Sequence, residues 1–413
     1  MWPQSVCLIN ARVAADGGEC RTLRFASRIL ALDEPPHRRD VVIDLGGAFV
    51  LPGLVNAHDH LELNHYGLQK GRERYSNVSE WVDDMRPRLR DDPAIRDRAA
   101  HPLADRIFIG LLKNLLSGVT SVAHHNPLYG ELRHSPLRIV RRFGWAHSFG
   151  MQHEPVGARG ERGGAISARF LDTPSGAPFI VHLGEGVDRD ARMELDRLDA
   201  IGCLAPHTVL VHGLAIDADG WNTVQARGSG VVWCPASNQF LFGDAARHPI
   251  WCEPGRATAD PADRADPANN VSLGTDSRLT GARDLLDELR VAHTSSSIGP
   301  ASLLRMVTST PARLLRLPHA GRLAVGVPAD LCVVPARDGD AAGALLATTR
   351  RDLELVVVGG RPAVGAAAMA SVFAARRVTS RSISVDGFGK LADASLVRRI
   401  SRSSIDEPGV VAG

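Results

Sequence analysis

The sequence predicts an α/β protein: a (β/α)8-type (TIM) barrel, distorted on one side, with a small β-sandwich domain built from both chain ends. Between residues 51 and 317, apolar runs that end in polar residues alternate with amphipathic stretches. This alternation is typical of parallel strands covered by helices. Residues 1–50 and 318–375 instead show short apolar runs separated by turn residues, as small β-hairpins do.

The expected elements follow in chain order. Residues 3–50 include "SVCLINARVAADGG" and "DVVIDLGGAFV", which are read as hairpin strands. The expected barrel strands are "LPGLVNAHDH", "GVTSVAHH", "GWAHSFG", "PFIVHLGE", "TVLVHGLA", "GVVWCPASN" and "NVSLGTDS". Between them, "LADRIFIGLLKNLLSG" and "ARDLLDELRVAHTSSS" have the apolar spacing of amphipathic helices. The chain returns to strands in "GRLAVGVPADLCVVP" and "LELVVVGGRPAV", so both ends are expected to pair in one domain.

Three segments do not fit this regular pattern. Only one strand pair is evident between His60 and His182, so a regular eight-stranded barrel needs one more strand. Either "MQHEPVGARGERGGAI" contains a degenerate strand or the barrel is distorted on this side. Residues 243–270 are expected to form a long loop, and residues 376–413 a tail that is poorly ordered or loosely docked.

Composition excludes several classes of protein. The 413 residues are 44% hydrophobic, with 48 Lys and Arg against 46 Asp and Glu, so nothing indicates the basic stripe of a nucleic-acid-binding protein. The sequence lacks an apolar run of membrane-spanning length and a recognisable signal peptide. Its six cysteines are scattered without a CxxC pair and are expected to be free thiols in a reducing compartment. We therefore expect a cytoplasmic protein with a small-molecule substrate and no nucleic-acid or membrane partner. A homo-oligomer is left open.

Polar residues stand where the expected strands end, and in a parallel barrel these ends surround the active site. They are His58, His60, His124, His125, His147, His182, Glu185, His212, Asn238 and Asp276. His58 and His60 are two apart on a strand and both point into the barrel, whereas Asp59 points toward the helical layer. One divalent metal is within reach of both imidazoles, because zinc–nitrogen bonds are about 2.0–2.1 Å long. Further histidines and an aspartate at other strand ends strengthen this prediction, since an uncompensated buried cluster would be costly.

Several motifs of this sequence occur in the same order as the motifs of a known protein family. "PGLVNAHDH", "VHLGE", "VHG", "CPASN" and "LGTDS" are followed by "TSTPARLL" and "GRLAVGVPADLCVV". The series is similar to that of the amidohydrolase superfamily, and within it to the branch of cytosine and guanine deaminases and triazine chlorohydrolases. The resemblance covers nearly the whole chain to about residue 335.

The resemblance implies a role for each matching residue. One divalent metal ion, Zn2+ in preference to Fe2+, would be held by His58, His60, His182 and Asp276, with a water completing the site. Glu185 would shuttle protons, and Asp276 would also take the proton of the attacking water. His212 would orient that water or polarise the substrate, and it is a metal ligand only in some members.

The lysine positions bear on the number of metal ions. Binuclear members of the superfamily usually bridge two metals with a carbamylated lysine on a middle strand. Lysine occurs in this chain only at Lys70, Lys113 and Lys390, so the middle strands contain none. A mononuclear centre follows from the resemblance.

Six residues near the strand ends are candidates for substrate binding: Glu62, Asn64, His124, His125, Asn238 and Arg278. Glu62 and Asn64 begin a long covering segment and could read the donor and acceptor edge of a ring. His124 and His125 fit substrate contact and structural hydrogen bonding equally well. Arg278 fits either an anionic or carbonyl group of the substrate or a surface ion pair.

The predicted function is metal-dependent hydrolysis of a C–N bond, with deamination of an amino-substituted heterocycle and release of ammonia favoured. The heterocycle would be a purine, pyrimidine, pterin or triazine-like ring. One alternative uses the same metal site to open a cyclic amide or imide, as imidazolone-cleaving relatives do. The other is a barrel that binds ligand without turnover, against which the presence of Glu185 and Asp276 argues.

Overall fold

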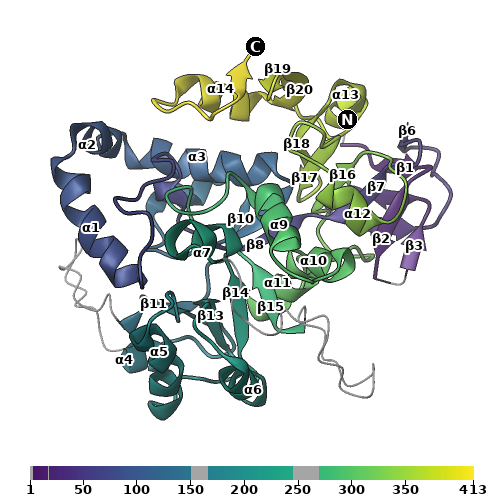
Figure 1. Cartoon of the computed structure of the whole chain (residues 1–413). Coiled ribbons are helices and arrows are strands. Elements are labelled where there is room, and N and C mark those ends of the chain that lie inside the picture. The colour runs from purple at the N-terminus through teal and green to yellow at the C-terminus, as the bar shows by residue number, and fades with distance from the viewer. Residues whose placement is uncertain (1–2, 17, 150–165, 245–268) are drawn as a thin grey trace.

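The computed structural model describes residues 3–16, 18–149, 166–244 and 269–413. In Figure 1 the N-terminal strands, in purple, lie beside the yellow-green strands of the C-terminal third, on one side of a larger assembly of helices and strands. The segment 151–166, considered above as the place of a degenerate strand, lies outside the described residues except for Ile166, and so does most of the expected loop 243–270.

The larger assembly is built on eight parallel strands within the described ranges, arranged in two sheets. One sheet has the order β10 (Arg138–Ile139), β9 (Val119–His124), β8 (Leu54–Asp59). The other has the order β11 (Gly144–Ala146), β12 (Phe179–Leu183), β13 (Thr208–His212), β14 (Gly230–Trp233), β15 (Val271–Leu273). All residues of β8, β9, β12, β13, β14 and β15 are buried. Burial on both faces explains why these strands appear in the sequence as continuous apolar runs.

The strand that the sequence analysis lacked is β10. It consists of only two residues, Arg138 and Ile139, and pairs in parallel with Ser121 and Val122 of β9. So short a strand carries no periodic signal, and it precedes β11 instead of following it.

Helices connect the parallel strands. They are α1 (Val78–Asp91), α2 (Pro93–Ala99), α3 (Leu103–Leu116), α4 (Ile166–Leu171), α5 (Arg189–Ala200), α6 (Ala218–Ala226), α7 (Pro235–Phe242), α9 (Leu285–Thr294), α10 (Pro300–Met306) and α11 (Ser309–Leu314), with short 3-10 helices η1 (Leu61–Leu63) and η2 (Gly130–His134). Three of them begin at an aspartate whose carboxylate accepts backbone N–H bonds: Asp188 for α5, Asp217 for α6 and Asp284 for α9. Such caps fix the residue at which each helix begins.

Strands from both chain ends make up two further sheets. A four-stranded sheet has the order β5 (Ile29–Leu32), β4 (Leu23–Phe25), β1 (Val6–Ile9), β6 (Val41–Asp44). A nine-stranded sheet has the order β21 (Val410–Ala412), β19 (Ser380–Val385), β20 (Phe388–Asp393), β18 (Arg361–Ala366), β17 (Leu355–Val358), β16 (Leu331–Val334), β7 (Phe49–Pro52), β2 (Arg12–Ala15), β3 (Gly18–Cys20). Leu8 of the first sheet and Leu331 of the second belong to one hydrophobic core. α12 (Ala341–Leu346), η6 (Ala367–Met369) and α13 (Ala370–Ala375) complete this part of the chain.

The structure corrects the expectation of a poorly ordered tail over residues 376–413. This segment forms β19, β20, α14 (Ala394–Arg402) and β21, and it extends the nine-stranded sheet. Ile383 and Val385 alternate with more exposed residues along β19 and are buried together with Leu396 of α14. The segment is ordered because it has an apolar face, although its overall composition is rich in arginine and serine.

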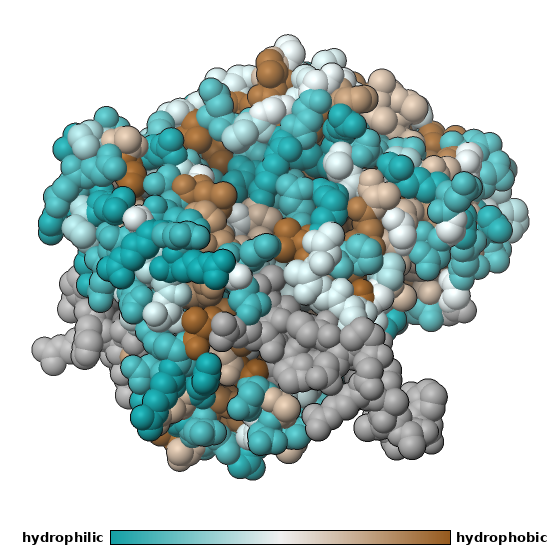
Figure 2. Space-filling model, in the orientation of Figure 1, coloured by the Kyte–Doolittle hydropathy of each residue, from teal (hydrophilic) through white to brown (hydrophobic). Residues whose placement is uncertain are grey.

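Figure 2 shows a face that is mainly hydrophilic, with hydrophobic residues in small separate patches. Within the described ranges, none of the helices combines the length and the apolar character needed to cross a membrane.

Candidate metal centre

The ends of three parallel strands bring imidazoles and a carboxylate together. His58 lies at the end of β8, with His60 just beyond it, His182 lies on β12, and Asp276 follows β15. Nε2 of His58 is 3.8 Å and Nε2 of His60 is 3.7 Å from Oδ1 of Asp276. The ring centroids of His58 and His182 are 4.9 Å apart. The four residues that the sequence analysis assigned to a metal therefore surround one small volume.

Local backbone features allow this close approach. Asp276 has φ +49° and His212 has φ +74°, values in the left-handed region that non-glycine residues seldom adopt. A Cβ at Gly274 would lie 2.6 Å from the Cβ of His58, so only glycine lets β15 approach β8 this closely. The backbone N–H of Asp276 then donates to the carbonyl of His58 at 3.1 Å. Unusual backbone conformations of this kind are often found at functional sites.

The donor set fits a divalent cation. Neither ring nitrogen of His58 has a hydrogen-bond partner within the described part of the chain, and the same holds for Nδ1 of His60 and of His182. Buried polar groups are normally satisfied, so this concentration of unpartnered imidazole nitrogens fits a site that binds a cation. Three sets have potential ligand atoms within 4.8 Å of one another: His58 with His60 and Asp276, His58 with His125 and His182, and His182 with Glu185 and His212. Two atoms bound to one ion in tetrahedral geometry lie about 3.4 Å apart, so the gaps to Asp276 need to close by only a few tenths of an ångström.

The protonation states suit metal binding. Burial lowers the pKa of His58 and of His182 well below the usual histidine range, so both imidazoles are neutral and keep a free electron pair. Burial alone would raise the pKa of Asp276, but the charges of His60 and His212 bring it below its usual value. The side chains of Ser237 and Thr280 donate to Oδ2 of this carboxylate at 3.0 and 2.7 Å, which fixes its orientation.

Glu185 and His212 form a pair of buried side chains next to His182. Burial raises the pKa of Glu185 well above its usual value, and the charge of Asp276 raises it further. The distance from Oε1 of Glu185 to Nε2 of His212 is 3.5 Å. Nδ1 of His212 lies 3.0 Å from Oδ1 of Asn238, and because an amide oxygen only accepts, Nδ1 carries the proton. The remaining nitrogen of His212 therefore faces the carboxyl group of Glu185.

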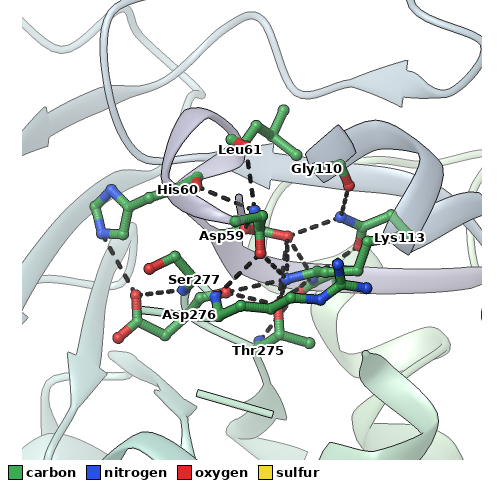
Figure 3. Close-up of polar contacts among 12 residues, drawn as sticks. Asp59, His60, Leu61, Gly110, Lys113, Thr275, Asp276 and Ser277 are labelled. Carbon is green, nitrogen blue, oxygen red and sulfur yellow. Dashed lines mark hydrogen bonds and ion pairs between the residues drawn. The ribbon is translucent and has the colours of Figure 1, made fainter. Parts of the chain in front are cut away.

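A buried polar cluster surrounds the carboxylate of Asp59 (Figure 3). Asp59 points away from His60, and Nζ of Lys113 lies 3.0 Å from its Oδ2. Asn64 donates to the other oxygen of Asp59 at 2.8 Å, and Asn114 donates to Oδ2 at 2.7 Å. The outward direction expected for Asp59 holds, and its partners are side chains of the covering segment and of α3.

The six expected substrate contacts have different outcomes. Arg278 forms two bonds of 2.7 Å to the buried carboxylate of Glu407, so its guanidinium is neither at a substrate position nor in a surface ion pair. Asn64 is likewise occupied within the protein by Asp59 and by Lys113, whose Nζ is 2.7 Å from Oδ1. In this structure both side chains are therefore engaged in buried polar clusters of the protein itself.

The other four candidates remain close to the histidines. Glu62 accepts from Asn126 at 2.6 Å, with Oε2 unpartnered among the described residues and 3.8 Å from Nδ1 of His124. Nε2 of His125 lies 3.1 Å from the carbonyl of Ala146, and the centroid of its ring lies 5.1 Å from that of His58 and 4.4 Å from that of His182. Asn238 contacts His212, as described above. Sequence reasoning missed Lys113 and Glu407, whose roles depend on partners distant in the chain.

Sequence comparisons identify proteins that are similar to this chain. A model of the amidohydrolase family matches residues 179–363. A 5-methylthioadenosine/S-adenosylhomocysteine deaminase of Syntrophobacter fumaroxidans is 27% identical, over 81% of this chain and 80% of that protein. An 8-oxoguanine deaminase of Pseudomonas aeruginosa is 26% identical, over 87% of this chain and 91% of that protein.

Solved structures share the fold. An atrazine chlorohydrolase of Arthrobacter aurescens complexed with zinc superposes with a TM-score of 0.66 at 19% identity, over 90% of this chain and 100% of that one. An adenosine deaminase of Xanthomonas campestris with bound zinc gives a TM-score of 0.62 at 18% identity, over 91% and 98% of the two chains.

Proposed function

Starting from its relationship to the amidohydrolase family, which the motifs and the comparisons agree on, we propose that this chain is a metal-dependent hydrolase that deaminates an amino-substituted heterocycle. One observation carries the proposal. The neutral imidazoles of His58 and His182, the carboxylate of Asp276 and the buried acid Glu185 lie at the ends of three parallel strands, β8, β12 and β15. This arrangement joins a cation site to a proton donor, as hydrolysis of a C–N bond requires.

The cation would be held by His58, His60, His182 and Asp276, and we propose zinc. When bound, a divalent ion supplies Lewis-acid chemistry that makes water a competent nucleophile near neutral pH. Three imidazoles and one carboxylate suit zinc, which accepts nitrogen and oxygen ligands in tetrahedral geometry. The zinc named in the two solved structures supports this choice.

Each remaining step is assigned to a side chain of this protein. Asp276, kept ionised by the neighbouring histidines, accepts the proton of the attacking water. Glu185, kept protonated by burial, delivers a proton to the departing nitrogen so that it leaves as ammonia. His212, oriented by Asn238, hydrogen-bonds the water or the substrate ring. The opposite pKa shifts of the two carboxyl groups separate the base from the acid.

We propose that the substrate is a purine bearing an exocyclic amine. The relatives named as methylthioadenosine/S-adenosylhomocysteine and 8-oxoguanine deaminases support this choice. Glu62 of η1 and His124 at the end of β9, whose side chains approach to 3.8 Å, are the residues we assign to the ring edge. We also propose that the two parallel sheets form one distorted (β/α)8 barrel, in keeping with the bond between Asp276 and His58 that joins their edges.

A mass and ammonia assay tests the function. Protein stripped of metal and reloaded with one equivalent of Zn2+ is incubated with adenosine, methylthioadenosine, S-adenosylhomocysteine, 8-oxoguanine, aminopyrimidines, pterins and triazines. Deamination gives a product about one mass unit heavier and stoichiometric ammonia, whereas opening of a cyclic amide gives a product about eighteen units heavier without ammonia. The second result with any substrate would replace deamination by the ring-opening function, and the stripped protein is the negative control.

A further inference from the structure

The polar cluster behind the metal centre contains a completely buried lysine. Lys113 lies near the end of α3, with no exposed surface, among apolar neighbours such as Leu112 and Leu115. Lysine is seldom fully buried unless it is paired, since its side chain normally extends to place the charge in water. Here the side chain points inward, toward the ends of β8 and β15 (Figure 3).

The ammonium group of Lys113 contacts residues at the ends of both β8 and β15, the two strands that carry His58 and precede Asp276. On the β8 side, Nζ lies 3.0 Å from Oδ2 of Asp59 and 2.7 Å from Oδ1 of Asn64. On the β15 side, it lies 3.0 Å from Oγ1 of Thr275 and 3.3 Å from the backbone carbonyl of Asp276. Asp59 stands between the two expected ligands of β8, and Asp276 is itself an expected ligand.

The cluster also fixes the backbone at these places. The side-chain oxygen of Asn56 accepts from the N–H groups of His58 and Thr275 at 3.3 and 3.1 Å. The bond from Lys113 to the carbonyl of Asp276 acts on the residue whose φ lies in the left-handed region. Within the described ranges, Asp59 is the one carboxylate that forms an ion pair with Lys113, and each partner would be a costly isolated charge without the other.

We propose that Lys113 is a positioning residue of the metal centre: by bridging Asp59 and the backbone of Asp276, it sets the geometry in which His58, His60 and Asp276 receive the cation. The inference rests on the proposed metal site, and it does not depend on which substrate is used. Residues that orient ligands in this way typically change metal affinity by about 10- to 100-fold when they are replaced.

A double variant separates this role from a purely structural one. Lys113→Met leaves Asp59 as a lone buried charge, so it is expected to lose stability as well as metal affinity. In Lys113→Met/Asp59→Asn the charge is removed from both partners, and most of the stability should return. The matched control is Lys390→Met, because Lys390 of the nine-stranded sheet is the other buried lysine and donates to the carbonyl of Leu353.

The measurements are the dissociation constant of Zn2+ for metal-free protein, from competition with a chelator, and the visible absorption spectrum of the Co2+ form. We expect the double variant to be folded, to bind Zn2+ about 10- to 100-fold more weakly than the wild type, and to show an altered Co2+ spectrum. Lys390→Met should bind within about twofold of the wild type with an unchanged spectrum. Wild-type affinity and spectrum in the double variant would overturn the proposal, as would a wild-type protein that binds no metal. A wild type that binds metal but releases ammonia from no substrate would overturn only the proposed function.

Discussion

Replacing Glu407 by glutamine should destabilise the whole protein, because its carboxylate neutralises two buried guanidinium groups. Arg278 reaches it with two bonds of 2.7 Å, and Arg350 reaches it with one of 2.5 Å. All three residues are buried: Glu407 is 2% exposed, Arg278 is 8% exposed and Arg350 is 3% exposed. In Glu407→Gln the negative charge is lost and an amide N–H2 group faces the donors of arginine.

The size of the effect follows from what each arginine retains. Breaking a buried ion pair by removing one partner costs about 3–5 kcal/mol. Arg350 keeps two bonds to Asp386, at 2.9 and 2.8 Å, whereas Arg278 keeps only its bond to the carbonyl of Arg283. We therefore expect the lower end of the range, about 3 kcal/mol. Because Arg278 is two residues from Asp276, metal affinity should fall as well.

Urea unfolding followed by tryptophan fluorescence measures the loss. With a urea dependence of at least about 3 kcal/mol per molar for a chain of this length, the midpoint should move down by up to about 1 M. Glu34→Gln is the control, because Glu34 pairs with Arg24 at 3.3 Å with 59% of its side chain exposed and should cost no more than about 1 kcal/mol. Equal midpoints for the two variants, with the slope unchanged, would refute the reasoning.

Three further predictions concern the metal centre and acid stability. His60→Ala should purify with strongly reduced zinc by elemental analysis, and full stoichiometric metal would remove His60 from the ligand set. Glu185→Gln keeps the shape of the side chain but not its titrating proton, so metal binding should survive while kcat falls by about 100-fold or more; near-normal turnover would place the proton donor elsewhere. The hydrogen bonds from Arg350 lower the pKa of Asp386 from 3.8 to about 2, so this carboxylate stabilises the folded state above about pH 4, and its contribution is lost as the pH falls through about 2. Wild type and Asp386→Asn should therefore differ in stability at pH 6 and converge near pH 2, and a constant difference at both pH values would contradict the assignment.

The metal ligands could be predicted from the sequence because their positions follow from local patterns. An apolar run ending in His58 and His60 places both side chains on one face of a strand, and parallel strand ends meet in space. The same argument applies to His182 and Asp276. The choice of these four residues as the ligand set also drew on the resemblance to the amidohydrolase superfamily.

Other features depend on contacts that no local pattern contains. Lys113 stands in an apolar helix, where a lysine usually extends to solvent, and only the fold shows that Asp59 lies on its buried side. Arg278 and Glu407 are 129 residues apart, so their pairing has no sequence signal. The strand β19 did have a sequence signal, since "SRSISV" places Ile383 and Val385 two residues apart. The arginines and serines around it nevertheless led to the prediction of a poorly ordered or loosely docked tail.

The pairing of β7 with β16 also has a consequence for how the chain is made. Phe49 of β7 lies opposite Val334 of β16, so the partner strand leaves the ribosome roughly 280 residues later. At a synthesis rate of about 5–20 residues per second, β7 remains without this partner strand for roughly 15–60 s. An open strand edge can pair with other chains, so we expect nascent molecules to depend on chaperones during this interval and slower translation to increase aggregation.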